Sequence, residues 1–378
     1  ETFRRLWERG YGFDYVSDRQ IGATAVSGGK LVTRGGHYRA LLVPSCEYMP
    51  AETLEKLLAL RERGGNVLFE SSPKDVPGRG ALDERRQRFG ELVDEVVACD
   101  DLESALSETG IERERMSDHE GLFFIRRRRG GGYHYFIANQ GTETFDDWVE
   151  LSVPCESVLI MDPMSGGTGT AQMRRNGQEV RLRLEPGTSR VLRTFDSDTV
   201  HADAWLYRQA REPWHTVHGT WSVEFIEGGP QLPSDYETDA LTSWTDRGGE
   251  AERFAGTALY RIEFDAPGAG KRWLLDLGEV RCSARVRING SEVDTLIAPP
   301  FKTVVENLEE SGNVLEVEVT NRAANRIRDL DRRGVEWRIF EDINFASWEY
   351  GTFDASDWPV MSAGLLGPVR LAGLDTAP

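Results

Sequence analysis

The stretch Ala258-Leu-Tyr-Arg-Ile-Glu-Phe-Asp265 decides the fold class of this chain, because apolar and charged residues alternate along it. One face carries Ala258, Tyr260, Ile262 and Phe264, and the other carries Arg261, Glu263 and Asp265. A period of two is typical of a β-strand that has one side on a hydrophobic core and the other in water. The stretch therefore predicts a half-buried strand.

The same alternation recurs in 273–277, 284–288 and 315–319, and Asn289-Gly290 follows the second of these stretches. Asn-Gly predicts a tight hairpin, since both turn positions tolerate positive φ. Many short alternating strands joined by Gly, Pro and Asn turns indicate a β-sandwich or jelly roll. Register is strongly specified when one face is buried, so we expect two sets of side chains. The buried set is Tyr260, Ile262, Phe264, Val286, Ile288, Val317 and Val319, and the exposed set is Arg261, Glu263, Arg285 and Glu316.

The first hundred residues have a different pattern, which is typical of an α/β domain. A short apolar strand at 38–44 is followed by a helix at 50–63, and a second strand follows at 66–69. Strand, helix and strand within about thirty residues predict a βαβ unit and thus a parallel sheet. A further helix is expected at 83–97. Cys46 follows the first strand, but its neighbours lack the glycines of a nucleophile elbow, so we do not expect it to be a nucleophile.

From residue 121 to residue 195 the pattern changes to short strands, at 133–139, 149–153, 157–161, 179–184 and 189–193. The polar stretch 196–214 predicts a linker with a short helix. The chain is therefore expected to be a multidomain, mainly β protein. The expected domains are an α/β domain at 1–110, a small antiparallel β-sandwich at 111–196, a linker at 197–215 and a jelly-roll β-sandwich at 216–378.

Composition excludes several function classes. The 45 basic and 63 acidic residues give a formal net charge of −18, which argues against nucleic acid and an anionic membrane surface as partners. The one basic cluster, 126–129, is expected to be a solvated hairpin end. The four cysteines are far apart, so neither disulfides nor a metal site are expected. No apolar run reaches the length of a transmembrane helix.

The start of the chain is expected to be a cut through a larger polypeptide. It lacks an initiator Met and begins inside a predicted helix, Thr2-Phe-Arg-Arg-Leu-Trp-Glu8. The compartment is therefore left open, with a periplasmic or secreted parent protein plausible.

Six segments occur in an order that resembles the galactose-binding-like jelly roll of family 2-type glycoside hydrolases. The closing stretch Ser362-Ala-Gly-Leu-Leu-Gly-Pro-Val-Arg-Leu371, which contains the last of them, resembles the C-terminal end of family 106 α-L-rhamnosidases. The α/β domain resembles the Rossmann-like, amidotransferase-like domain that follows the catalytic barrel in several glycoside hydrolases. The resemblance covers the whole chain in outline and is specific after about Trp221. The six segments are 256–261, 275–280, 286–290, 299–301, 315–321 and 364–371.

This resemblance implies the C-terminal accessory region of an α-L-rhamnosidase that acts on rhamnosides of plant or algal polysaccharides. In that family the acid and base lie on an upstream barrel, where calcium is also bound. No position here matches those motifs, so no catalytic residue, metal ligand or cofactor is expected within this chain, and the chain alone should not hydrolyse glycosides. The implied partners are a rhamnose-containing glycan and the upstream barrel. A non-catalytic carbohydrate-binding module and a purely structural scaffold are the alternatives.

The segment 335–359 has the composition of a binding site, because it is a long aromatic insertion between strands. Its rings are candidates for stacking on sugar, and its carboxylates and amide are candidates for hydrogen bonds to hydroxyls. A loop that docks on a neighbouring domain would have the same composition. The segment Asp329-Leu-Asp-Arg-Arg-Gly334 lacks the third acidic ligand and the closing Glu spacing of a calcium loop, so it is not expected to be a metal site. The candidate carbohydrate-binding residues are Trp337, Glu341, Asn344, Trp348, Glu349, Tyr350 and Trp358.

Overall fold

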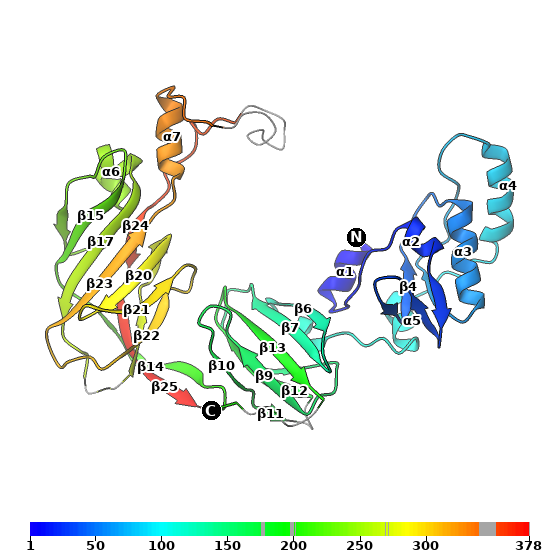
Figure 1. The fold of residues 1–378 in the computed structure, drawn as a ribbon, viewed down its shortest axis with the longest axis horizontal. Helices are drawn as coiled ribbons and strands as arrows, with labels where there is room; N and C mark the ends of the chain where they lie inside the picture. The colour runs from blue at the N-terminus through cyan, green and yellow to red at the C-terminus, as the bar shows by residue number, and fades with distance from the viewer. Residues whose placement is uncertain are drawn as a thin grey trace. The chain divides into compact units, whose positions relative to one another are not determined.

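The fold is described from a computed structural model, which covers residues 1–174, 178–196, 200, 202–268, 270, 272–339 and 353–377. The chain divides into two compact units. Unit 1 is Glu1–Leu184 with Ser189–Ala204, and unit 2 is Glu185–Thr188 with Trp205–Pro378. Most of the described secondary structure is antiparallel sheet (Figure 1). The mainly β, multidomain character expected from the sequence is thereby confirmed.

The first part of unit 1 contains the predicted βαβ unit. Strands β4 (Ala40–Val43) and β5 (Asn66–Phe69) pair in parallel, and helix α3 (Ala51–Glu62) connects them. Leu54, Leu57 and Leu58 of α3 are buried, as the helical spacing predicts. The other elements are α1 (Thr2–Glu8), α2 (Asp18–Gly22), β1 (Ala25–Ser27), β2 (Lys30–Val32), β3 (His37–Tyr38), α4 (Leu82–Val93) and α5 (Leu102–Glu108).

The second part of unit 1 consists of two antiparallel sheets, of strand order β10-β9-β13-β7-β6 and β11-β12-β8. A short 3₁₀ helix, η1 (Arg115–Asp118), precedes them. Four of the five predicted strands have the expected position, whereas the strand predicted at 149–153 lies earlier, at β8. The bounds are β6 (Leu122–Arg128), β7 (Tyr133–Asn139), β8 (Phe145–Glu150), β9 (Ser157–Met161), β10 (Thr168–Thr170), β11 (Met173–Arg174), β12 (Glu179–Leu184) and β13 (Ser189–Phe195).

The basic cluster at 126–129 is only partly the solvated hairpin end that the sequence indicates. Residues 127–129 are exposed, but Arg126 forms an ion pair with Glu114, a buried carboxylate. Glu114 also accepts hydrogen bonds from the Tyr135 hydroxyl at 2.8 Å and from the Ser152 N–H at 2.8 Å. A buried carboxylate needs such partners, which explains why Arg126 turns inward.

Unit 2 contains two larger antiparallel sheets, of strand order β14-β25-β18-β22 and β16-β15-β17-β23-β20-β21, and a small sheet β19-β24. Buried residues of both larger sheets, among them Tyr260, Val317, Leu275 and Leu371, belong to one hydrophobic core. The strand bounds are β14 (Tyr207–Thr216), β15 (Trp221–Gly229), β16 (Tyr236–Thr238), β17 (Ala255–Phe264), β18 (Arg272–Asp276), β19 (Glu279–Arg281), β20 (Ser283–Ile288), β21 (Ser291–Leu296), β22 (Lys302–Glu306), β23 (Asn313–Thr320), β24 (Gly364–Gly367) and β25 (Arg370–Ala377). The short helices are η2 (Trp244–Arg247), α6 (Gly249–Arg253) and α7 (Ala324–Arg332).

The strand phase predicted for unit 2 is confirmed. All seven side chains of the predicted buried set are buried, and Arg261, Glu263 and Arg285 are exposed. Glu316 of the exposed set is half-buried, because it lies beside Arg261 on β17 at 3.8 Å. The predicted hairpin is also present, since Ile288 pairs with Ser291 and both turn residues, Asn289 and Gly290, have positive φ.

The polar connector is where the structure departs most from the sequence prediction. Within the described part of 196–216 there is no helix, and residues 207–216 form β14 instead. β14 pairs with β25, the last strand of the chain. Most β14 side chains are exposed or half-exposed, so the segment lacks the alternation that would have indicated a strand.

The described helices are too short and too polar to cross a bilayer.

Candidate functional site

The candidate loop of unit 2 leaves and returns beside helix α7. We use "neck" for residues 335–339 and 353–361, which flank the part of the loop outside the described residues. Helix α7 lies at the end of the unit 2 sheets (Figure 1) and packs against α6. Three α7 side chains spaced three residues apart, Asn325, Arg328 and Asp331, hold the neck. This spacing places them along one side of the helix.

Asn325 and Arg328 bind the returning chain through its backbone. The Asn325 amide donates to the Met361 carbonyl at 2.7 Å and accepts from the Met361 N–H at 2.8 Å. Arg328 donates from Nε to the Trp358 carbonyl at 2.7 Å, and its Nη1 lies 3.2 Å from Glu252. These contacts fix the path of 358–361 without depending on the identity of its side chains.

Asp331 joins the two legs of the neck. Its carboxylate accepts from the Trp337 indole Nε1 at 2.6 Å on the outgoing leg and from the Ala355 N–H at 2.8 Å on the returning leg. Arg338 lies 3.3 Å away. Burial works to raise the pKa of Asp331, but the hydrogen bonds from Ala355, Trp337 and Arg338 together hold the pKa below its ordinary value. Asp331 is therefore an ionised clamp.

Three aromatic rings make up the body of the neck. The Phe353 ring lies edge-on to Trp337, with centroids 6.1 Å apart, and edge-on to Trp358, at 5.6 Å. The Arg338 guanidinium lies 5.7 Å from both the Trp337 and Phe353 centroids. Such edge-to-face contacts and cation–π contacts favour one fixed arrangement of the rings.

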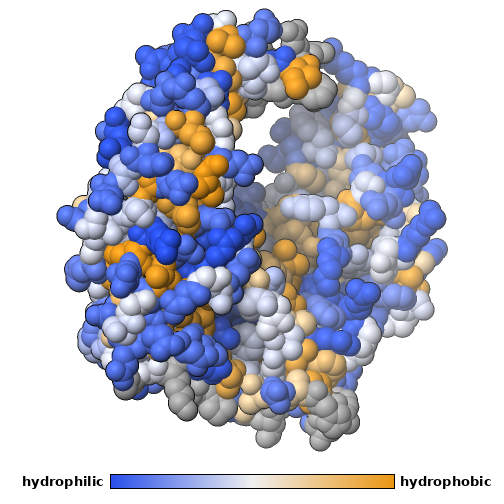
Figure 2. Space-filling view, turned by 60° about the vertical axis from the view of Figure 1, so that its left-hand side comes forward, coloured by the Kyte–Doolittle hydropathy of each residue, from blue (hydrophilic) through white to orange (hydrophobic). Residues whose placement is uncertain are grey.

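The neck also exposes apolar surface. Trp358 is 39% exposed and lines a shallow cavity of about 540 Å³ together with Arg328, Asp331, Arg332, Ser356 and Asp357. Exposed hydrophobic groups are scattered among hydrophilic ones on the face in Figure 2. Around the neck they are concentrated, and the exposed large apolar residues there are Val335, Ile339, Trp358, Val360 and Met361.

The structure brings Trp337 and Trp358 of the predicted site together at the neck through Phe353. Trp337 is half-buried and Trp358 is partly exposed, so neither ring is fully buried in the core of unit 2. The other candidates, Glu341, Asn344, Trp348, Glu349 and Tyr350, lie outside the described residues. Phe353, Arg338 and Asp331 were missed by the sequence analysis, although Asp331 follows Asn325 and Arg328 at helical spacing.

The structure also bears on a Cys46 nucleophile and on metal binding. Burial raises the pKa of the Cys46 thiol, which is the opposite of the shift that activates a cysteine nucleophile. Across the described ranges, no three His, Cys, Asp or Glu residues lie together in a way that could hold a metal ion.

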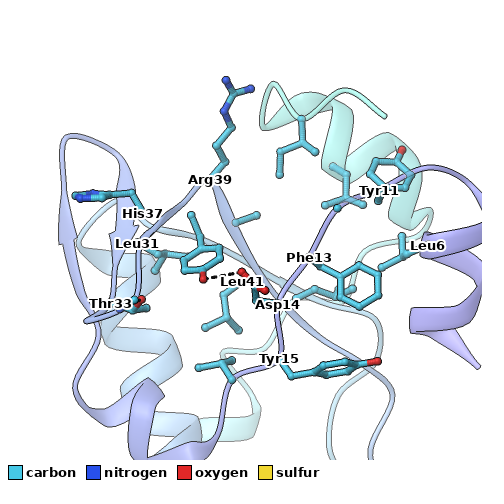
Figure 3. Close-up of a pocket in the computed structure, with 18 of the residues that line it drawn as sticks. Leu6, Tyr11, Phe13, Asp14, Tyr15, Leu31, Thr33, His37, Arg39 and Leu41 are labelled. Atoms are coloured by element: carbon cyan, nitrogen blue, oxygen red, sulfur yellow. Dashed lines mark hydrogen bonds between the residues drawn. The ribbon is translucent and has the colours of Figure 1, made fainter. Parts of the chain in front are cut away.

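Unit 1 contains a larger cavity that the sequence analysis did not predict. Its volume is about 730 Å³, within the usual range for ligand sites. The segment 11–16 runs across it in Figure 3, and the hairpin 31–39 and strand β4 form another wall. The alternation in Tyr11-Gly-Phe-Asp-Tyr15 was the available signal for an extended segment with aromatic rings on one side.

Comparison with known proteins finds a family match in the first half of the chain. Residues 5–174 match the model of glycoside hydrolase family 106, described as alpha-L-rhamnosidase. This range covers the α/β part of unit 1 and most of its two antiparallel sheets. The family match thus lies upstream of Trp221, whereas the resemblance of the sequence motifs is specific after about Trp221.

Two individual proteins are similar to the chain over different extents. A rhamnosidase from Novosphingobium sp. PP1Y has a similar fold over 97% of this chain, with a TM-score of 0.70 and 23% identity. A Formosa agariphila protein with the provisional name beta-glucuronidase is 35% identical over 40% of this chain. The chain spans 36% of the length of the first protein and 15% of the second.

Proposed function

We propose that the chain is the accessory region of an α-L-rhamnosidase, because residues 5–174 match the model of the alpha-L-rhamnosidase family of glycoside hydrolases. The whole protein would hydrolyse rhamnosides of plant or algal polysaccharides. The family match at residues 5–174 is the observation that carries this proposal. The similarity in fold to a rhamnosidase over almost the entire chain supports it.

The accessory role is supported by the described sheets, because they do not form a catalytic (β/α)₈ barrel. A (β/α)₈ barrel needs a closed ring of eight parallel strands. Among the named strands of the described residues, only β4 and β5 pair in parallel, and they form a two-stranded sheet. The proposed domains are a Rossmann-like domain, a small β-sandwich and a galactose-binding-like jelly roll. Their role would be to support the barrel and to present surfaces to it or to the polysaccharide.

Catalysis is assigned to the barrel of the whole protein. Glycoside hydrolysis uses two carboxylates at a defined separation, one of which protonates the leaving oxygen. Calcium, which the family resemblance places at the active site, has no fitting set of ligands in the described residues, because no cluster of three acidic, His or Cys side chains lies there. We therefore derive no catalytic step and no metal site from the described residues.

A second function, carbohydrate binding, is favoured by the neck of unit 2. Trp358 presents part of its ring beside a cavity that also holds the charged groups of Arg332 and Asp357. An indole face can stack on the C–H groups of a sugar while charged groups accept or donate hydrogen bonds to hydroxyls. The same exposed apolar surface would suit docking of the barrel.

One experiment tests the accessory assignment. The purified 378-residue chain and a longer polypeptide that includes the barrel are assayed on an aryl α-L-rhamnoside. We expect turnover by the longer polypeptide alone. Turnover by the 378-residue chain that disappears when one of its own acidic residues is replaced would refute the accessory role. If the longer polypeptide hydrolyses an aryl β-glucuronide but not the rhamnoside, the proposal that its substrates are rhamnosides is refuted.

Retention on a rhamnose-containing polysaccharide separates the two roles of the neck. Trp358→Ala should weaken retention if the neck binds sugar, and should leave retention unchanged if the neck is only a docking surface. Trp205→Ala, a substitution of a half-buried Trp outside the neck, is the control.

A further inference from the structure

The five-stranded sheet of unit 1 has two faces of different burial. Its strands lie side by side in the order β10-β9-β13-β7-β6 (Figure 1). Tyr135, Ile137 and Leu192 point to one face and are completely buried. Because successive side chains of a strand point to opposite sides, the residues between them belong to the other face, which we call the outer face. There Ile125 is 60% exposed and Phe136 is 44% exposed, although both are large and apolar.

An apolar strip crosses the outer face from strand to strand. Ile125 of β6 pairs with Phe136 of β7. Phe136 pairs in turn with Val191 of β13, and Val191 pairs with Met161 of β9. Residues that pair in this way have Cβ atoms about 5 Å apart, so the four side chains form a continuous strip, which we call the apolar row. Contiguous apolar surface that faces solvent marks a place where a partner or ligand binds.

A basic strip runs beside the apolar row. Arg127 of β6 pairs with His134 of β7, and His134 pairs with Arg193 of β13. We call these three residues the basic row. Each lies two positions along its strand from a member of the apolar row, which is about 7 Å. The outer face therefore presents apolar and basic groups next to each other on one continuous surface.

The basic row has no counter-ion within the described part of the chain. No carboxylate there forms an ion pair with Arg127 or Arg193, although the chain has 63 acidic residues. The neighbouring Arg126, by contrast, pairs with Glu114. Opposite charges on paired strands stabilise a sheet and like charges destabilise it, so the row lacks a stabilisation that the composition could supply. An arrangement that costs stability is typical of a functional surface.

The imidazole in the middle of the basic row responds to this local positive charge. Burial, together with the charges of Arg193 and Arg129, lowers the pKa of His134 below its ordinary value. At neutral pH the imidazole is therefore uncharged and can donate one hydrogen bond, while the arginines on both sides of it carry the charge.

We propose that the outer face binds an acidic polysaccharide, with its carboxylates on the basic row and the C–H groups of its sugar rings on the apolar row. A guanidinium has two parallel N–H donors that match the two oxygens of a carboxylate. Arg127 and Arg193 are two strands apart, about 10 Å, so a ligand that reaches both carries more than one carboxylate. A polyuronate has repeated carboxylates as well as rings with apolar faces. The surface holds the polymer and takes no part in hydrolysis.

Other ligand classes fit the outer face less well. Duplex DNA carries one negative charge per about 1.7 Å, which needs a larger basic footprint than two arginines and is repelled by a net charge of −18. A polyuronate carries at most one charge per sugar unit. At physiological ionic strength, charges more than about 8 Å away are largely screened, so the basic row outweighs the net charge at the contact.

Isothermal titration calorimetry with the 378-residue chain tests the surface. The probes are an oligogalacturonate and the same oligomer with methyl-esterified carboxylates, which keeps the sugar rings and removes the charge. We expect saturable binding of the acid, with a dissociation constant about tenfold or more below that of the ester. Absence of saturable binding of the acid, or equal affinities for acid and ester, would overturn the proposal. Tighter binding of a single-stranded oligodeoxynucleotide would overturn the choice of a polysaccharide.

Substitutions in the basic row locate the binding. Arg127→Gln should weaken binding of the acid by about fivefold, the size expected for one largely exposed ion pair. Arg127→Lys keeps the charge and should recover most of the binding. Arg79→Gln is the matched control, since it makes the same change of charge at an exposed position of unit 1 outside the sheet. If Arg127→Gln and Arg79→Gln bind alike, the outer face is not the site.

Two further measurements separate binding from a structural role. Arg127→Gln removes a charge that has no counter-ion, so its melting temperature should not fall below that of the wild type. A lower melting temperature with unchanged affinity would show that the row is structural and would overturn the proposal. Ile125→Ser should also weaken binding of the acid, and an unchanged affinity would overturn the role of the apolar row.

This inference rests on the proposed function for the choice of a polysaccharide. The two fail separately, because hydrolysis of an aryl rhamnoside is measured on the longer polypeptide and does not require the outer face. Rhamnoside hydrolysis without binding of the acid would remove the outer-face proposal alone. If the 378-residue chain binds the acid and the longer polypeptide does not, the outer face is a docking surface within the whole protein, and the proposal is likewise overturned.

Discussion

The Asp331 carboxylate accepts a 2.6 Å hydrogen bond from the Trp337 indole and thereby ties helix α7 to the outgoing leg of the unit 2 loop. The same carboxylate binds the Ala355 N–H on the returning leg, and its side chain is only 4% exposed. Asp331 therefore holds both legs of the neck through hydrogen bonds.

Asp331→Ala should destabilise the neck by about 1.5–3 kcal/mol, the usual range for a lost hydrogen bond to a charged group. Limited proteolysis should show faster cleavage between residues 335 and 361. Asp357→Ala is the control, because Asp357 is exposed at the same neck. Equal cleavage rates for the two variants would contradict the clamp.

The same neck should loosen in acid. The pKa of Asp331 is lowered in the folded protein, so its ionised form stabilises the neck fully above the ordinary Asp pKa of about 3.9. That stability is lost as the pH falls through the lower folded-state pKa. Cleavage by an acid-active protease should therefore rise in the wild type as the pH falls below about 4, and Asp331→Asn should remove most of this dependence. A wild-type cleavage rate that is constant over this range would contradict the assignment.

Glu114→Gln should destabilise unit 1 by about 2–4 kcal/mol, because it leaves the Arg126 guanidinium without its carboxylate partner. Urea unfolding measures the change. Glu120→Gln, at an exposed position nearby, should have little effect. Replacing Arg126 by Met in the Glu114→Gln background should recover part of the loss, and no recovery would argue against a coupled pair.

Leu315→Ala should cost about 2–5 kcal/mol, since Leu315 is completely buried in β23 and its removal leaves a cavity. Val314→Ala changes the neighbouring residue, which is half-buried on the other face. Its cost should be clearly smaller. A larger effect at Val314 would show that the strand has the opposite phase in solution.

Gly364→Ala should destabilise unit 2 by more than about 1 kcal/mol. Gly364 has a φ of +106°, and an added Cβ would lie 2.3 Å from the hydroxyl of Tyr260, whose side chain is buried and cannot move aside. At Gly268 an added Cβ would meet no atom within 4 Å. Thermal unfolding of Gly364→Ala and Gly268→Ala compares the two sites, and similar melting temperatures would contradict the close packing at Gly364.

The candidate site was only partly predictable. The aromatic composition of 335–359 indicated a site, and the structure places Trp337 and Trp358 together. The clamp by Asp331 depends on hydrogen bonds to a residue 24 positions away, which no local pattern reveals. The inward turn of Arg126 likewise depends on a buried carboxylate at Glu114.

The sequence by itself determined which face of each unit 2 strand is buried, as well as the Asn289-Gly290 hairpin and the βαβ unit of β4, α3 and β5. These features follow from side-chain periodicity and turn chemistry, which act between near neighbours. The tertiary structure alone decided that β14 pairs with β25, and that segment 11–16 lies across a cavity beside Tyr38 and Leu41. Each of these arrangements is stabilised by partners distant in the chain, so no local pattern in either segment reveals which residues it contacts.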